Sequence, residues 1–436
     1  MSAPVKSRRV LVVTNALPPT MPADSQRARI LAASLAAQGW SVELLVPDAA
    51  FQIAVYQDVP AAALLPEGVP VHAARPGNDR LLRAAGMRSM AWRALWPMYR
   101  LGAEVLSRKP FDLVYITTAQ FNFFCLGRLW KRKFGVPYIL DFHDPWFRGQ
   151  SQYSTTPINW KHYVGLHLAK HMERFALQSA AGLIAVSPDY LAQIHDRYPR
   201  FKCVQPGRNR AIPFGVLERD FEVAKASPPA ASHAPAILEI IYVGAGRSIM
   251  AKSFQRICQG LARLRQSEPG LLKDLKIRLL GTYAYWTPGD PKELQTLAES
   301  EGVGDLVAEE PARIGYVKAL RLALDAQGLL VLGVDDPAYM PSKLFLYALT
   351  GKPLLACLHD NSQVNDYFKR FPELGTLIHF SGPAEKVGAE DRLLRDFLLQ
   401  VAGRQTFARD NIRQEYSAAT MARQHVDLFE KCLNPS

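Results

Sequence analysis

The chain has 436 residues, of which 48% are hydrophobic and 21% are charged, and its formal net charge is +12. These values are typical of a folded protein of one to three domains with a sizeable core. No apolar run reaches the length of a membrane-spanning helix, and residues 1–9 are basic without the hydrophobic region of a signal peptide. The five cysteines are scattered and form no C-x-x-C pair, which argues against a disulfide framework and a zinc site. We therefore expect a cytoplasmic protein.

Apolar strands and amphipathic helices alternate along the first half of the chain. The first strand covers residues 10–14, and the helix that follows has apolar residues at helical spacing and ends at Gly39, before a second strand at 42–46. Further strands are predicted at 113–116, 138–140 and 183–186. Because the strands alternate with helices, this half predicts a parallel sheet that is covered on both faces.

The same alternation returns after an aperiodic segment. Residues 223–236 are rich in Ala, Pro and Ser, which predicts a linker. A strand at 237–243 then leads into a turn that contains Gly244 and Gly246. Later strands are predicted at 277–281, 328–332, 354–357 and 375–379. We thus expect an α/β protein with two doubly wound parallel-sheet domains, whose ligands bind beyond the carboxyl ends of the strands in the cleft between the domains.

Basic and aromatic side chains concentrate in residues 75–133. This segment has twelve Lys and Arg against three Asp and Glu and includes Trp92 and Trp96, and we expect Pro97 to interrupt its helix. A basic surface with aromatic residues fits anionic lipid headgroups. The alternative is a solvated basic helix whose tryptophans face the core. No nucleic-acid-binding motif is present, so we expect no nucleic-acid partner.

Residues 341–353, which read P-S-K-L-F-L-Y-A-L-T-G-K-P, follow a predicted strand and a polar loop with Asp335 and Asp336. Ser342 is predicted to cap a helix that ends at Gly351, with Lys343 in its first turn. A helix N-terminus offers unpaired N–H groups and partial positive charge, which suit a phosphate. The alternative is an ordinary turn with a capping serine and no ligand.

Several segments, taken in order, resemble family 4 glycosyltransferases with the GT-B fold. They read R-R-V-L-V-V-T-N-A-L-P-P, V-P-Y-I-L-D-F-H-D-P-W, E-R-F-A-L-Q-S-A-A-G-L-I-A-V-S-P-D-Y, I-P-F-G-V-L-E-R-D-F and P-S-K-L-F-L-Y-A-L-T-G-K-P. The resemblance implies a Rossmann-like acceptor-side domain at residues 1–228 and a Rossmann-like nucleotide-sugar domain at 229–414. It also implies a C-terminal helix at about 415–434 that packs back on the first domain.

The resemblance also implies which residues act on the donor. Arg247 and Lys252 follow the opening strand of the second domain and are similar to the basic pair that grips the diphosphate. Preorganised cations at this place would stabilise the charge that develops on the leaving group. His143 is similar to the donor-site histidine of the family, and we group it with these two cations as catalytic.

Other residues are expected to bind the substrates. On the donor side these are Gly244, Gly246, Asp336, Ser342 and Lys343, and on the acceptor side they are Arg27 and Asp144. The chain departs from the family at Leu346, where a glutamate commonly contacts the ribose of the donor. A carboxylate for the ribose would then have to come from the loop with Asp335 and Asp336.

Together these features predict a hexosyltransferase-type glycosyltransferase, acting with retention, that transfers a sugar from a nucleotide-sugar to a lipid-linked or saccharide acceptor in cell-surface polysaccharide biosynthesis. We expect no cofactor and no metal, because no D-x-D lies in a suitable loop and no His/Cys cluster is present. We expect the protein in the cytoplasm or peripherally on the cytoplasmic membrane face. Two alternatives stay open: a binding or scaffold protein that lost the chemistry, and a sugar-nucleotide epimerase of the same fold.

Overall fold

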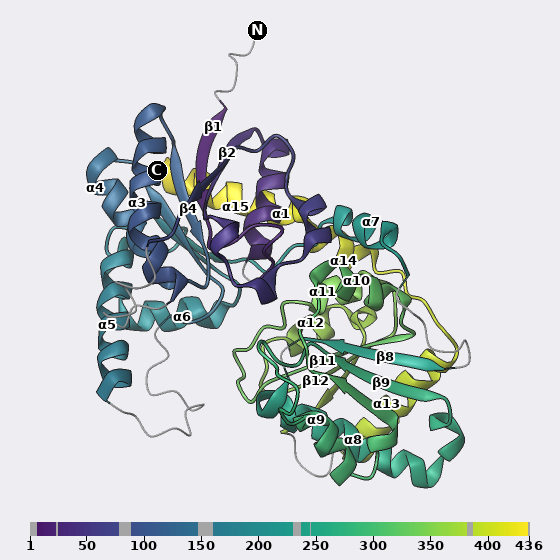
Figure 1. The fold of residues 1–436 in the computed structure, drawn as a ribbon. Helices are drawn as coiled ribbons and strands as arrows, with labels where there is room; N and C mark the ends of the chain where they lie inside the picture. The colour runs from purple at the N-terminus through teal and green to yellow at the C-terminus, as the bar shows by residue number, and fades with distance from the viewer. Residues whose placement is uncertain are drawn as a thin grey trace. The chain divides into compact units, whose positions relative to one another are not determined.

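The computed structural model describes residues 7–22, 25–77, 89–146, 160–229, 237–244, 246–381 and 387–434. The chain forms two units, shown in Figure 1. The first runs to Gly215 and takes up the residues from Ala418 onward, and the second covers Val216–Ser417. Each unit is built on one parallel sheet, of seven strands in the first and six in the second, which confirms the expected fold class.

The sheet of the first unit has the strand order β3-β2-β1-β4-β5-β6-β7, and every neighbouring pair is parallel. Its strands are β1 Arg8–Val13, β2 Trp40–Pro47, β3 Val71–Ala74, β4 Leu113–Thr117, β5 Tyr138–Phe142, β6 Gly182–Ala185 and β7 Asn209–Ala211. The central strands are almost fully buried because helices cover both faces. The order reverses between β1 and β4, and ligands of such sheets bind at a reversal of this kind.

The helices of the first unit include one from the far end of the chain. They are α1 Ser25–Leu35, α3 Met90–Arg108, α4 Phe124–Phe134, α5 Trp160–Leu177, α6 Pro188–Arg197 and α15 Ala418–Leu433. In Figure 1 the yellow α15 lies among the purple and blue elements of this unit. Its Phe429 packs edge-on against Trp40 of β2 and against Tyr115 of β4, at ring distances of 5.4 and 5.3 Å. The last helix of the chain is therefore part of the first core.

The sheet of the second unit has the order β10-β9-β8-β11-β12-β13. Its strands are β8 Leu238–Val243, β9 Leu275–Leu280, β10 Val307–Glu310, β11 Gly328–Leu332, β12 Leu354–Leu358 and β13 Thr376–His379. Its helices are α7 Glu218–Ala226, α8 Ala251–Ser267, α9 Glu293–Ser300, α10 Tyr316–Asp325, α11 Leu344–Ala348, α12 Asn365–Arg370, α13 Val387–Ala402 and α14 Asp410–Glu415. The apolar side chains form two large clusters, to which alternate residues of β11 and β12 contribute, so both faces of the sheet are packed.

The boundary between the units differs from the expected one at 228/229. Helix α7 belongs to the second unit, where it forms hydrogen bonds with α10. The hydroxyl of Tyr316 donates to the side chain of Asp220 at 2.7 Å, and Arg321 donates to the backbone carbonyl of Lys225 at 2.9 Å. At the other end, residues 415–417 also belong to the second unit. Of the linker predicted at 223–236, residues 230–236 lie outside the described residues.

The prediction that Pro97 interrupts its helix is wrong. Helix α3 runs from Met90 to Arg108 with Pro97 inside it. A proline leaves the carbonyl four residues earlier without its helical donor. Here that carbonyl belongs to Arg93, and it accepts a hydrogen bond from the backbone N–H of Gly77 at 2.9 Å. The replacement donor removes most of the cost of an internal proline.

Among the helices in the described part of the chain, none is both long enough and apolar enough to span a membrane.

Gly102 of α3 gives a test of the packing in the first unit. A methyl group on Gly102 would overlap the ring of Trp130 and lie 2.9 Å from Leu45 Cδ2. We expect Gly102→Ala to lower the free energy of unfolding by about 1–3 kcal/mol. Gly165 of α5 is the matched control, because nothing lies within 4 Å of an added methyl there. Gly165→Ala should raise stability by up to about 1 kcal/mol. Urea unfolding of the two variants compares them, and equal effects would contradict the packing.

Candidate functional site

In the first unit, polar side chains meet where β1, β4 and β5 end. Thr14 and Asn15 follow β1, Thr117 ends β4, Thr118 follows it, and His143 follows β5. All five residues are buried, and Thr118 donates a hydrogen bond to Asn15 Oδ1 at 3.1 Å. This edge coincides with the reversal of strand order between β1 and β4. It is the place where a doubly wound sheet binds its ligand.

Asp141, the next-to-last residue of β5, is the centre of a buried polar network. Its Oδ2 accepts hydrogen bonds from the hydroxyls of Tyr115 and Thr117, at 2.6 and 2.8 Å. The same oxygen lies 3.0 Å from Nε of Arg27 in an ion pair that is completely shielded from solvent. Burial alone would raise the pKa of this carboxyl group, but Arg27 and then His143 hold the pKa of Asp141 well below its usual value. Asp141 is therefore an anion inside the core.

Arg27 of α1 cannot serve as the acceptor contact that we expected. Its side chain has no exposed surface, and it donates to the backbone carbonyls of Ile212 and Pro213 at 2.6 and 3.2 Å. Its guanidinium also lies over the ring of Phe214, 4.7 Å from the centroid. These contacts tie α1 to the segment after β7. Arg27 is therefore a structural residue. We expected it to contact a ligand because it lies near the first loop in the sequence.

His143 lies beside this network, with only 4% of its side chain exposed. Its Nε2 is 2.8 Å from Thr117 Oγ1 and 3.2 Å from Asp141 Oδ2, and its ring packs edge-on against Phe214. Its Nδ1 is buried without a hydrogen-bond partner in the described structure. A buried polar atom without a partner is a rare and costly feature, and it marks a place for a ligand atom. Asp144, the other residue expected here, is half-buried.

His425 of α15 joins the same network from the far end of the chain. Its Nδ1 lies 2.7 Å from the carbonyl oxygen of Met421, which can only accept, and its Nε2 lies 3.1 Å from the Tyr115 hydroxyl. Burial, reinforced by the charge of Arg27, lowers the pKa of His425 to about 3. The histidine is therefore neutral at physiological pH. Nothing in the sequence around His425 distinguished it from a surface residue of an amphipathic helix.

In the second unit, Gly244 and Lys343 come together at the carboxyl ends of β8 and β11. These strands are neighbours, and the strand order of this sheet also reverses between them. Gly244 has φ of +147°, and a Cβ there would lie 3.1 Å from Lys343 Nζ. Lys343 forms no ion pair with a described carboxylate, and its burial, with the charge of Arg313, lowers its pKa to about 8. A partly buried cation at a strand reversal is suited to an anionic ligand.

Arg247 and Lys252 are both engaged with carboxylates. Arg247 Nε donates to Glu293 Oε1 at 3.0 Å, and Lys252 Nζ donates to Asp335 Oδ2 at 2.5 Å. More than half of each cationic side chain is exposed, so exchange of these partners for a phosphate is inexpensive. Arg247 has φ of +60°, an unusual value for a residue with a side chain, and strained backbone clusters at functional sites. The chain also turns closely at Gly246, whose added Cβ would lie 2.7 Å from that of Thr282.

The helix predicted from Ser342 is much shorter in the structure. Helix α11 covers only Leu344–Ala348, and Ser342 is exposed and makes no capping bond to it. The cation of a candidate anion site here is therefore the Lys343 side chain, and no helix end at Ser342 contributes to it. Asp336 uses its Oδ1 to accept from the N–H of Ala338 at 2.9 Å, which closes its own loop. Leu346 packs against the apolar cluster of the second unit, so it supplies no polar contact.

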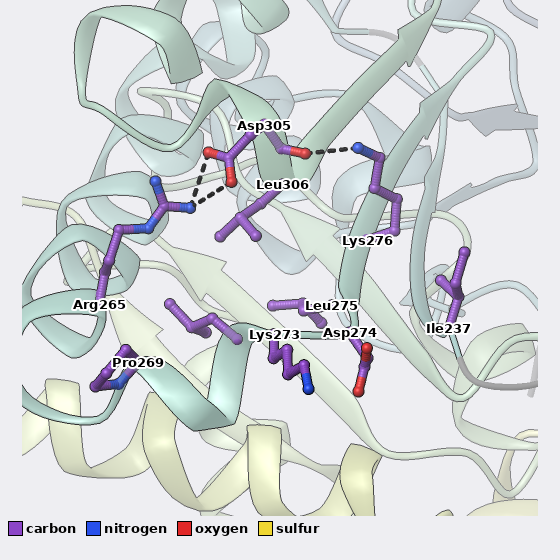
Figure 2. Close-up of a pocket in the computed structure, with 10 residues that line it drawn as sticks. Ile237, Arg265, Pro269, Lys273, Asp274, Leu275, Lys276, Asp305 and Leu306 are labelled. Carbon is purple, nitrogen blue, oxygen red and sulfur yellow. Dashed lines mark hydrogen bonds and ion pairs between the residues drawn. The ribbon is translucent and has the colours of Figure 1, made fainter.

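A pocket of about 450 Å³ lies at the opposite, amino-terminal edge of the same sheet. Figure 2 shows Asp305 between two cations in its wall: Arg265 donates to both carboxylate oxygens at 2.8 and 2.9 Å, and Lys276 donates to the backbone carbonyl at 2.5 Å. These cations are already neutralised or bonded within the wall. The pocket is therefore separate from the Gly244–Lys343 site and is a poor candidate for an anion. Across the described ranges, no group of three or more His, Cys, Asp or Glu side chains could hold a metal ion.

Comparison with known proteins gives a family match within the first unit and a similarity of fold over both units. Residues 25–215 match the model of the glycosyl transferase 4-like domain. HepE of Anabaena, solved with UDP-glucose, has a TM-score of 0.61 at 13% identity, over 97% of this chain and 99% of that one. The UDP-forming α,α-trehalose-phosphate synthase of Burkholderia xenovorans has a TM-score of 0.57 at 11% identity, over 98% and 100%. WaaG, a glycosyltransferase involved in lipopolysaccharide biosynthesis, has a TM-score of 0.52 at 14% identity, over 97% of this chain and 96% of that one. A search of curated proteins gave no match.

The pKa of His425 predicts how stability depends on pH. Between its ordinary value of 6.5 and about 3, the unfolded chain binds a proton that the folded chain does not. The contribution of this group is therefore fully present above pH 6.5 and is lost as the pH falls toward 3, by up to about 1.4 kcal/mol per pH unit. His425→Gln keeps a donor and an acceptor but does not titrate, so its unfolding free energy should depend less steeply on pH. Parallel slopes for the two proteins in urea titrations would contradict the burial of a neutral His425.

Proposed function

We propose that this chain, whose residues 25–215 match the glycosyl transferase 4-like domain and whose two units have the GT-B fold, is a glycosyltransferase that uses a nucleotide-sugar. The donor would bind to the second unit, and the sugar would pass, with retention of configuration, to a lipid-linked or saccharide acceptor in cell-surface polysaccharide biosynthesis. The observation that carries the proposal is Lys343, a partly buried cation without a described anionic partner beside Gly244. HepE, which has the same fold, binds UDP-glucose.

The diphosphate of the donor fits the charges at this edge. Lys343 approaches the backbone at Gly244, where the absence of a side chain lets a phosphate reach both. Arg313 is close enough to Lys343 to lower its pKa, and a phosphate between the two would relieve their repulsion. Arg247 and Lys252 would then leave Glu293 and Asp335 and bind the outer oxygens. Four cations would thus face two phosphates.

The chemistry asks the protein to stabilise a departing nucleoside diphosphate. Fixed cations aimed at the leaving oxygen act in the transition state, when negative charge grows there, and so they lower the barrier. We propose that these side chains act in place of a divalent ion, so donor binding and transfer should persist in EDTA. His143 would form a hydrogen bond with a substrate hydroxyl at the carboxyl edge of the first sheet.

One observation favours the alternative of a binding protein that lost the chemistry. Leu346 packs against the apolar cluster of the second unit. In the family that this chain resembles, a glutamate that binds the ribose is common at this position. Asp335 is paired with Lys252 and Asp336 closes its own loop, so neither offers a carboxylate before a ligand arrives. Such a protein would bind a nucleotide-sugar without hydrolysing or transferring it. Measuring binding and turnover separately distinguishes the two functions.

The donor site can be tested with charge variants and a panel of UDP-, GDP-, ADP- and dTDP-sugars in EDTA. We expect one nucleotide to raise the melting temperature, because a ligand of the folded state stabilises it. Lys343→Met, Arg247→Ala and Lys252→Ala should each weaken its binding by about 1.5–3 kcal/mol, the usual worth of a hydrogen bond to a charged group. Glu293→Gln is the opposite control: it frees Arg247, so binding should strengthen. No response to any nucleotide, or full affinity in all three cation variants, would refute this site.

The first unit offers a face for the membrane that would present a lipid-linked acceptor. Trp96 of α3 is 63% exposed and stacks on Tyr99, with ring centroids 5.2 Å apart. Arg100 of α3 and Arg132 and Lys133 of α4 are also exposed, and α3 and α4 pack together. The basic segment that suggested this face continues at residues 78–88, which lie outside the described residues. We propose reversible docking of this face on anionic lipid, with each basic residue contributing about 1 kcal/mol.

Vesicle co-sedimentation at low and high salt tests the docking. The protein should bind anionic vesicles more than neutral ones, and salt should weaken the binding because it screens the charges. Arg132→Glu combined with Lys133→Glu should lower binding at least about tenfold at low salt. Lys369→Glu, the same kind of change at an exposed residue of the second unit, should leave binding unchanged. Equal, negligible binding to both kinds of vesicle would leave the basic face as a solvated surface.

A further inference from the structure

The buried network around Asp141 determines which nitrogen of His143 carries the proton. Asp141 is ionised, so its Oδ2 can only accept hydrogen bonds. His143 Nε2 faces this oxygen at 3.2 Å and Thr117 Oγ1 at 2.8 Å. If Nε2 carried a lone pair, that lone pair would point at a carboxylate anion. The Nε2–H form removes this repulsion.

The hydroxyl of Thr117 also favours the form of His143 that carries its proton on Nε2. It has one proton, and the charged oxygen of Asp141 at 2.8 Å is a stronger acceptor than an imidazole nitrogen. Once Thr117 donates to Asp141, its oxygen can only accept from His143 Nε2. The chain of bonds then runs from His143 to Thr117 to Asp141. The Arg27 guanidinium holds Asp141 in place from the other side, at 3.0 Å.

The other nitrogen is thereby left as an acceptor. With the proton on Nε2, Nδ1 carries a lone pair that can accept a hydrogen bond. This nitrogen is buried and has no hydrogen-bond partner in the described structure. It can accept a hydrogen bond from a hydroxyl or an N–H, and it cannot donate to a carbonyl, carboxylate or phosphate oxygen. The ring is fixed in direction by its contact with Phe214.

We propose that Thr117 and Asp141 are positioning residues that keep the proton of His143 on Nε2, so that Nδ1 accepts a hydrogen bond from a hydroxyl group of a ligand bound at this edge of the first sheet. The identification of the partner as a substrate hydroxyl rests on the proposed function, but the position of the proton does not. The inference assigns a role to two side chains that touch no substrate. It also limits the ligand group at His143 to a hydrogen-bond donor.

The position of the proton can be measured in the free protein. Side-chain nitrogen NMR of the full chain, with isotopically labelled histidine at about pH 8.5, distinguishes a protonated ring nitrogen from a bare one. The His143 signals are those that disappear in His143→Gln. We expect a protonated Nε2 and a bare Nδ1. His425 is an internal control with the opposite form, because its Nδ1 donates to the carbonyl of Met421. A protonated Nδ1 on His143 would overturn the proposal.

Thr117→Val and Thr117→Ser test the positioning role. Valine has nearly the same shape without the hydroxyl, so we expect part of the His143 population to move its proton to Nδ1, while the His425 signals stay unchanged. Serine restores the hydroxyl and should restore the wild-type spectrum. If the His143 spectrum of the valine variant is unchanged, Asp141 alone keeps the proton on Nε2. Thr117 would then not be a positioning residue. Because the spectra need no ligand, failure of the donor-binding experiments leaves this result interpretable.

Discussion

The buried ion pair between Arg27 and Asp141 organises the first unit. Both side chains are fully shielded from solvent, and removing either charge would leave the other unpaired in the core, at a cost of about 3–5 kcal/mol. Around this pair the structure joins α1, two central strands, the segment after β7 and the last helix of the chain. The ion pair also helps to fix the position of the His143 ring, because His143 bonds to the same carboxylate oxygen. It therefore affects where a ligand group could bind to His143.

The two units prepare their sites in different ways. In the first, buried hydrogen bonds fix His143 before a ligand arrives, and little freedom is left to lose on binding. In the second, Arg247 and Lys252 are paired with Glu293 and Asp335, whereas Lys343 has no carboxylate partner among the described residues. A diphosphate that bound as proposed would displace Glu293 and Asp335, so an exchange of charged partners would accompany its binding. Both sites lie where the strand order of their sheet reverses.

The sequence predicted the parallel sheets, because strand periodicity is a local signal. The residues that follow each strand are also a local signal, and they led us to place the candidate sites at the carboxyl edges of the sheets. It did not predict the buried role of Arg27, since its partners Ile212 and Asp141 are more than a hundred residues away. Ser342 was wrongly taken as a helix cap because a serine before an apolar run fits a cap and a plain turn equally well. Pro97 lies within α3, where the N–H of Gly77 supplies the donor that the carbonyl of Arg93 lacks. The roles of Arg27 and Pro97 therefore depend on contacts with other segments, whereas the error at Ser342 reflects an ambiguous local signal.

The place of α15 has a consequence for how the chain is made. His425 and Phe429 complete a polar network and an aromatic cluster whose other side chains lie within the first 143 residues. A ribosome adds these two residues only after the whole second unit has been synthesised. Although domains usually fold from the N-terminus as they emerge, the first unit here stays without one wall of its core until α15 has been added. The second unit, continuous in sequence, can form before the first is complete.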